Sequence, residues 1–180
     1  MTTTLFSLVF WLAAPFWAAM ILAPHRVWTR RLVASPWIVL PPLLVYLALM
    51  LPHFARFFAA MLRPDLTTLR DILGDDWGAA TVWAHLIAFD LFIGRWIYLD
   101  SRSRSISPLL VSPILFVTIL LSPIGLLSYL LVRELVSLTR RGSAGLDAVT
   151  VDLGGEGGVA ARRGMEGQPD QAHLGVQDGQ

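Results

Sequence analysis

Apolar residues in this chain gather in four long runs, separated by short polar or basic stretches. Each run approaches the roughly 20 residues that a helix needs to cross the ~30 Å hydrocarbon core of a bilayer. We therefore predict an all-α, polytopic membrane protein with four transmembrane helices. The predicted helices cover about residues 5–23, 32–51, 77–98 and 108–132.

The segment between the second and third predicted helices has a different pattern. Large apolar side chains recur there at helical spacing beside arginines, which is typical of an amphipathic helix at the membrane interface. A second short helix is expected to begin after Asp65, as its N-cap, and to end at Gly74. We therefore predict an interfacial helical loop over residues 53–76. A soluble connecting loop is the alternative.

Composition supports the membrane class. Hydrophobic residues make up 55% of the 180 residues and charged residues only 15%, against the roughly 25% charged residues of a soluble domain. The chain has no cysteine, which excludes disulfides and thiolate chemistry. The four histidines do not show metal-ligand spacing, so we predict neither a metal site nor a cofactor. No basic face interleaved with exposed aromatics indicates nucleic-acid binding.

The composition changes abruptly at Gly142. Residues 142–180 contain 10 of the 14 glycines and no aromatic residue, so they can bury little apolar surface. We predict a disordered, Gly-rich, acidic tail over 142–180 and a four-helix membrane domain over 1–141. The basic stretch after the first helix favours an N-terminus on the outer side of the membrane.

The third predicted helix carries polar residues at membrane depth. In the window 79–98, eight Leu, Ile, Phe or Val residues contribute roughly −2.4 to −4.8 kcal/mol to insertion, whereas Asp90 near the midplane costs about +3 kcal/mol. Such residues usually face the interior of a bundle and mark function. One purely structural alternative is that Asp90 donates to the carbonyl of Ile119, which Pro123 leaves unbonded.

The polar residues of this helix lie on different faces. Asp90 and Arg95 are about 140° apart at 100° per residue, so each needs its own partner. Arg95 shares a stripe with three alanines that would allow another helix to approach closely, and it either snorkels or binds a buried partner. His85 lies on an aromatic face, where a histidine is commonly a packing residue. Trp83 and Gly94 share the face of Asp90.

The segment 83–100, Trp-Ala-His-Leu-Ile-Ala-Phe-Asp-Leu-Phe-Ile-Gly-Arg-Trp-Ile-Tyr-Leu-Asp, resembles the signature of a membrane-protein family. It is the abscisic-acid-deficient family, that of the plant plastid protein needed to form neoxanthin, with similar short proteins in bacteria. The resemblance extends to Ser-Pro-Ile-Gly-Leu-Leu-Ser-Tyr-Leu at 122–130, and more loosely to the first helix. It covers residues 5–133 and not the tail.

The resemblance implies a four-helix membrane protein that isomerises or otherwise processes a carotenoid or isoprenoid lipid. Opening an epoxide to an allenic alcohol needs an acid on the oxygen and a base on a chain proton. Asp90 and His85 are the candidate catalytic residues, with Arg95 as electrostatic support and Trp83 and Gly94 as ligand-binding positions. The N-terminus has no obvious transit peptide, so we expect a bacterial protein of the inner membrane.

Two further function classes remain open at the level of sequence. The chain fits a non-catalytic membrane module that binds a lipophilic ligand or assembles as a homo- or hetero-oligomer, because it lacks a complete catalytic set. Transport would suit the proline-broken helices, but no internal repeat supports it. The expected partners are therefore the lipid bilayer, a lipophilic isoprenoid ligand or another protein subunit.

Overall fold

The computed structural model describes residues 1–140, and all regular structure in that range is helical. Residues Met1–Glu134 form one compact unit. The predicted tail lies outside the described residues. The helices are α1 (Thr2–Leu22), α2 (Val27–Ala34), the 3-10 helix η1 (Pro36–Val39), α3 (Leu40–Met50), the 3-10 helix η2 (Leu51–His53), α4 (Phe54–Leu62), α5 (Leu66–Gly74), α6 (Asp76–Ser103), α7 (Pro108–Leu120) and a helix over residues 122–140.

Three helices in the described part of the chain are long and apolar enough to cross a membrane: Thr2–Leu22, Pro36–Leu62 and Asp76–Ser103. They correspond to the first three predicted spans. The second is assembled from η1, α3, η2 and α4. Its first three pieces each have proline at the N1 or N2 position, where the missing amide donor costs nothing.

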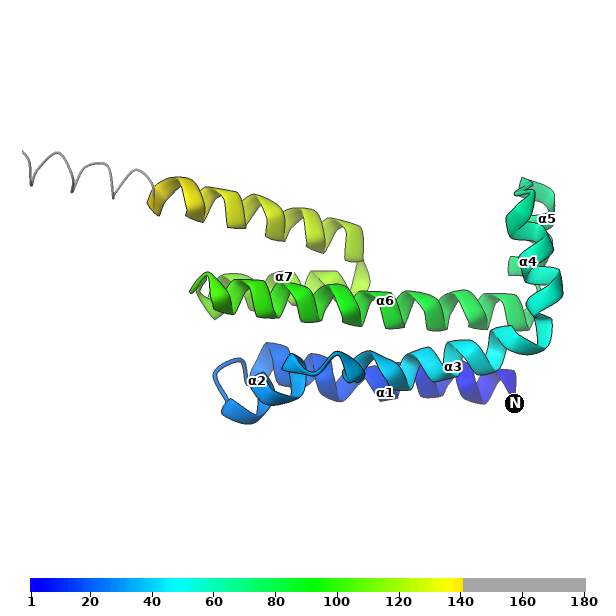
Figure 1. Cartoon of the computed structure of the whole chain (residues 1–180), viewed down its shortest axis with the longest axis horizontal. Helices are drawn as coiled ribbons and strands as arrows, with labels where there is room; N and C mark the ends of the chain where they lie inside the picture. The colour runs from blue at the N-terminus through cyan, green and yellow to red at the C-terminus, as the bar shows by residue number, and fades with distance from the viewer. Residues whose placement is uncertain (141–180) are drawn as a thin grey trace, which may run out of the picture. The chain divides into compact units, whose positions relative to one another are not determined.

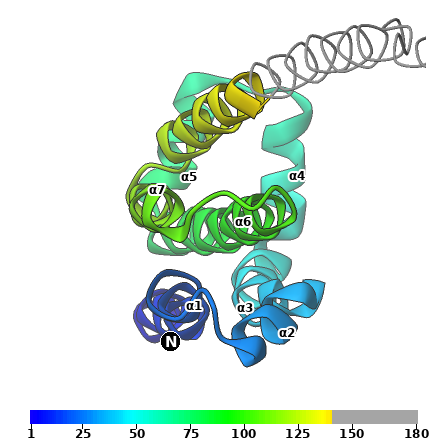
Figure 2. The ribbon, with the colours of Figure 1, turned by 90° about the vertical axis from the view of Figure 1, so that its left-hand side faces the viewer.

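The central element is α6, which packs against α1, α3, α5 and α7 (Figures 1 and 2). Small residues of α6 let the neighbouring helices approach it closely. Ala80, Ala84 and Ala88 are all buried, and a side chain at Gly94 would collide with the Trp17 ring of α1. The small-residue stripe predicted from the sequence therefore packs within the chain.

Two predicted boundaries were wrong. The basic stretch after α1 forms the helix α2, which buries Thr29 and Val33 on its inner face. The third helix continues past Tyr98 to Ser103, which brings Asp100 and Arg104 to i,i+4 spacing. Both segments carry charged residues on one side and buried residues on the other. Their charge therefore indicates loops, although their inner sides pack within the bundle.

The helix predicted over 108–132 is divided into two helices, at the segment 122–125 where its apolar run is interrupted by Pro123 and Gly125. Helix α7 ends at Leu120, Leu121 has a non-helical backbone with φ −143° and ψ 69°, and a new helix begins at residue 122. Pro123 is the physical cause. It has no amide hydrogen to donate to the Ile119 carbonyl, whereas in the first turn of the new helix this missing donor costs nothing.

The chain reverses direction at this break, as Figure 1 shows. Ser112 of α7 donates to the carbonyl of Ile21 at the end of α1 (3.2 Å), whereas Tyr129 of the next helix reaches Asp100 at the end of α6. The break itself lies beside Asp90, in the middle of α6. Helix α7 and residues 122–134 therefore form a helical hairpin that starts and ends near the same end of α6.

Candidate functional site

His85 lines an apolar groove between α3 and α6. The groove has a volume of about 270 Å³ and is lined by Val39, Leu43, Tyr46, His85, Ala88, Phe89 and Phe92. The His85 ring lies 5.6 Å from the Tyr46 ring and 5.7 Å from the Phe89 ring, measured between centroids. Tyr46 and His85 are the only two lining side chains with polar atoms, so the groove offers a hydrocarbon chain few but localised polar contacts.

Asp90 lies on a different face of α6, toward the hairpin. Its carboxyl group interacts electrostatically with the Ser122 hydroxyl at the helix break and with the His85 ring. The Ser122 hydroxyl is buried, but it has no partner at hydrogen-bond distance and angle within residues 1–140. The residue at the helix break that interacts with Asp90 is therefore Ser122. A hydrogen bond from Asp90 to the Ile119 carbonyl stays a prediction.

Arg95 has hydrogen-bond partners within the chain. Its Nε donates to the carbonyl oxygens of Val33 (2.9 Å) and Ser35 (3.3 Å), and its Nη2 donates to that of Ala34 (2.7 Å). These carbonyls belong to the C-terminal end of α2, where helical carbonyls lack partners and carry partial negative charge. Arg95 therefore caps α2 from a helix more than 60 residues later in the sequence.

Trp83 and Gly94, the two candidate ligand-binding positions, face α1. The Trp83 ring stacks on the Phe6 ring with centroids 5.4 Å apart, and Gly94 gives room to Trp17. Both contacts fix α1 against α6. The five candidate residues thus contact four different neighbours of α6, and the structure does not bring His85, Asp90 and Arg95 together in one site.

A polar cluster at the end of α6 was missed from the sequence. Asp100 Oδ2 accepts from the Tyr129 hydroxyl at 2.6 Å and from Arg104 Nε at 2.8 Å, and Arg133 Nη1 lies 3.9 Å away. Tyr129 is fully buried, and Trp96 packs edge-on against its ring. The i,i+4 spacing of Asp100 and Arg104 was a signal for part of this cluster.

These features define a helical protein with three helices long and apolar enough to cross a membrane, whose central helix has an open aromatic groove on one side and a polar hairpin contact on another. Residues 4–129 match the family model described as ABA4-like, ABA DEFICIENT 4-like. The match covers more than half of the chain, and the protein belongs to the ABA DEFICIENT 4-like family.

A curated relative supports this assignment. The chain is 26% identical over 129 residues to the Protein ABA DEFICIENT 4, chloroplastic, of Arabidopsis thaliana. The alignment covers 68% of this chain and 57% of that protein, so the chain spans little more than half the length of its relative. No solved structure matches this chain.

Proposed function

We propose that this protein binds a carotenoid or a related isoprenoid lipid in the groove between α3 and α6 and processes it within the bilayer. The observation that carries the proposal is the lining of that groove. Exposed Phe89 and Phe92 give a polyene or isoprenoid chain an apolar path from the lipid, and His85 and Tyr46 lie along it. A groove of this size holds one part of a long chain.

Membership of the ABA DEFICIENT 4-like family supports the same class of ligand, because that family resembles the plant protein needed for neoxanthin formation. The corresponding reaction would be an isomerisation that opens an epoxide to an allenic alcohol without gain or loss of atoms. One group protonates the epoxide oxygen and another accepts a proton from the chain.

His85 is the candidate acid–base residue that lines the groove, so we assign it direct contact with the ligand. Asp90 remains the second candidate. It lies on the hairpin side of α6 and interacts with His85 through space. We propose that Arg95, Trp83 and Gly94 contribute by positioning α2 and α1 against α6 rather than by touching the ligand.

The test is expression of the full chain in a host that makes violaxanthin, followed by chromatography of the pigments. His85→Gln and Asp90→Asn should each insert normally and abolish the pigment change made by the unmodified chain. His25→Gln, an exposed histidine in the loop after α1, is the matched control and should keep the activity. Product formation by both His85→Gln and Asp90→Asn would refute the catalytic proposal.

A non-catalytic module that binds the same ligand is the second proposal, and the groove supports it equally. In that case the pigment co-purifies with the chain but is chemically unchanged. Tyr46→Ala together with Phe89→Ala would then reduce the bound pigment, whereas His85→Gln would leave it in place. These outcomes distinguish storage of a ligand from its conversion.

We further propose that η1, α3 and η2 cross the membrane, and that α4, the last part of the long helix Pro36–Leu62, lies with α5 at the membrane surface. Phe54 and Phe58 of α4 stack with centroids 5.6 Å apart and are exposed on one face, while Arg56 pairs with Asp75 at 2.8 Å. A helix with an apolar face and charged residues beside it is typical of the membrane–water interface. The bacterial inner membrane stays our prediction for the location.

A further inference from the structure

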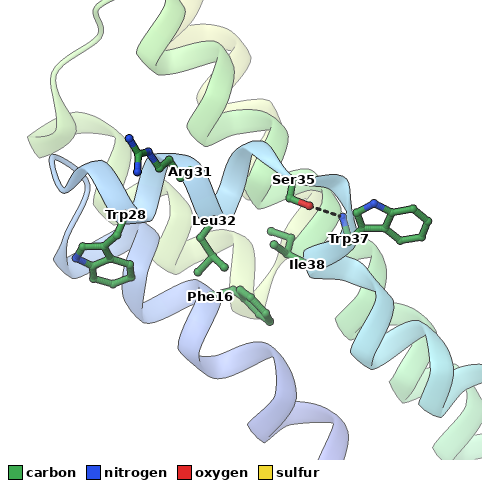
Figure 3. A pocket seen from close by; sticks show the side chains of 7 residues that line it. All are labelled: Phe16, Trp28, Arg31, Leu32, Ser35, Trp37 and Ile38. Carbon is green, nitrogen blue, oxygen red and sulfur yellow. Dashed lines mark hydrogen bonds between the residues drawn. The ribbon is translucent and has the colours of Figure 1, made fainter.

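We propose that a second groove, formed by α1, α2 and η1, binds an anionic phospholipid of the surrounding bilayer. This proposal does not depend on the function proposed for the groove at His85. The second groove has a volume of about 600 Å³ and is lined by Phe16, Trp28, Arg31, Leu32, Ser35, Trp37 and Ile38. Figure 3 shows Phe16, Leu32 and Ile38 converging between two tryptophans at opposite ends.

The lining is apolar over its length and basic near one end. Phe16, Leu32 and Ile38 provide the surface that an acyl chain would cover. Trp28 and Trp37 are 55% and 70% exposed, which is typical of indoles at the boundary between hydrocarbon and headgroups. Because α2 follows directly after the first span, this groove lies at a membrane face rather than at the midplane.

The charge at this face is uncompensated. Arg31 lines the groove, and Arg26 and Arg30 lie on the same short segment. None of the three belongs to an ion pair recorded among residues 1–140, whereas Arg56, Arg104 and Arg133 are all paired with acids. Guanidinium groups are matched in geometry to phosphate oxygens, and arginines next to a membrane attract anionic lipid.

Arg95 makes the site favourable for an anion. The carbonyls at the C-terminal end of α2 would otherwise place partial negative charge beside Ser35, a residue of the groove. Arg95 binds these carbonyls from the protein side and offsets that charge. The Tyr98 hydroxyl also donates to the carbonyl of Pro24 at 2.9 Å, so the segment before α2 is fixed to α6. The groove is therefore held in place before the lipid binds.

A lipid explains the whole groove, whereas a soluble phosphate would explain only the arginines. The occupant inferred here has a phosphodiester headgroup near Arg31 and one acyl chain along Leu32 and Ile38. Its apolar part would remove the exposed faces of the tryptophans from contact with other lipids. Both the arginine charge and the apolar lining therefore favour an anionic lipid over a soluble phosphate.

Native mass spectrometry of the full chain in detergent tests the proposal. The probes are phosphatidylglycerol and phosphatidylcholine with identical acyl chains, and glycerol phosphate as the free headgroup. We expect phosphatidylglycerol to be retained more strongly than phosphatidylcholine, and Arg31→Gln to weaken its binding about fivefold. Arg63→Gln, an exposed arginine at the end of α4, should leave binding unchanged.

A groove-filling variant tests the apolar half of the site. Leu32→Trp keeps every arginine and should reduce the retention of phosphatidylglycerol while the thermal transition stays the same. Equal retention of the two lipids by the unmodified chain would overturn the proposal. So would competition by glycerol phosphate as strong as that by phosphatidylglycerol, or an equal loss in Arg63→Gln and Arg31→Gln.

Discussion

The hydroxyl of Tyr129 donates a hydrogen bond of 2.6 Å to the carboxylate of Asp100, and this contact joins the last part of the hairpin to the end of α6. A helix that ran through the membrane from Pro108 would carry residue 129 to the opposite face. Helix α7 has 13 residues and is about 20 Å long at 1.5 Å per residue, which is too short to cross a ~30 Å core. The hairpin is therefore re-entrant if the three long helices span the membrane.

The re-entrant hairpin predicts which residues share a side of the membrane. The chain contains no cysteine, so single cysteines can be introduced and labelled from either side of sealed vesicles. Ser107→Cys and Glu134→Cys should react from the same side, and Thr68→Cys from the other. A continuous fourth span would instead place Ser107→Cys and Glu134→Cys on opposite sides, which would contradict the hairpin.

The distribution of arginines predicts the orientation. Six arginines of the unit Met1–Glu134 lie at the end of the bundle that holds the C-terminal ends of α1 and α6: Arg26, Arg30, Arg31, Arg102, Arg104 and Arg133. Three lie on α4 and α5 or between them: Arg56, Arg63 and Arg70. The positive-inside rule therefore places Met1 outside. A protease-sensitive tag before Met1 should be cleaved in intact cells, and its full protection would refute this orientation.

Gly125 predicts a steric requirement at the hairpin. A Cβ atom at this position would lie 2.7 Å from Thr118 Cα and 2.8 Å from Thr118 N, and backbone atoms cannot move aside cheaply. Gly125→Ala should therefore destabilise the protein by about 1–3 kcal/mol. Gly74→Ala is the control, because no atom lies within 4 Å of its Cβ position. Equal thermal transitions of the two variants in detergent would contradict close packing at Gly125.

The hydrogen bonds of Arg95 to the end of α2 predict a difference in stability between two variants. Arg95→Gln leaves the carbonyls at the end of α2 without a charged donor and should cost about 2–4 kcal/mol, because these bonds are charged and partly buried. Arg95→Lys keeps the charge but loses the multiple donors, so its loss should be smaller. Denaturation in mixed micelles measures both. Identical stabilities of Arg95→Gln and the unmodified chain would show that the cap is unimportant.

Asp65 predicts a pH dependence of α5. Its carboxylate accepts from the Thr68 amide at 3.0 Å, and this backbone hydrogen bond is the main cause that holds the pKa of Asp65 below the ordinary 3.8. The cap is therefore fully present above pH 3.8 and is lost as the pH falls through the lowered pKa. Amide exchange in α5 should accelerate at low pH, after correction for intrinsic rates. Asp65→Asn should remove that dependence.

The sequence predicted the parts of the fold that depend on local pattern. The three long apolar runs, the Asp65 cap and the end of α5 at Gly74 are all local features, and the structure confirms them. The separation of Asp90 from Arg95 around α6 also follows from helical periodicity. The partners of these residues could not be predicted in the same way. Arg95 binds carbonyls about 60 residues away, and neither side of that contact has a sequence signal.

The hairpin shows a second limit. Leu121 and Pro123 lie inside an apolar run that is long enough to span, so hydropathy predicts one helix. A single proline can kink a helix or end it, and the surrounding contacts decide which occurs. Here Thr118 against Gly125, and Tyr129 against Asp100, favour reversal. Both contacts involve residues that look unremarkable in the sequence.

The helix break at Leu121 also has a consequence for the order of membrane assembly. Each of the three long helices can enter the bilayer as an independent segment, because it satisfies its own backbone hydrogen bonds. The hairpin interrupts the helical backbone at Leu121, and its polar contacts are with Asp90 and Asp100 of α6, so it can form only after α6 is in place. We therefore expect a nascent chain truncated before α6 to be inserted stably, and the hairpin to be the last part of the bundle to form.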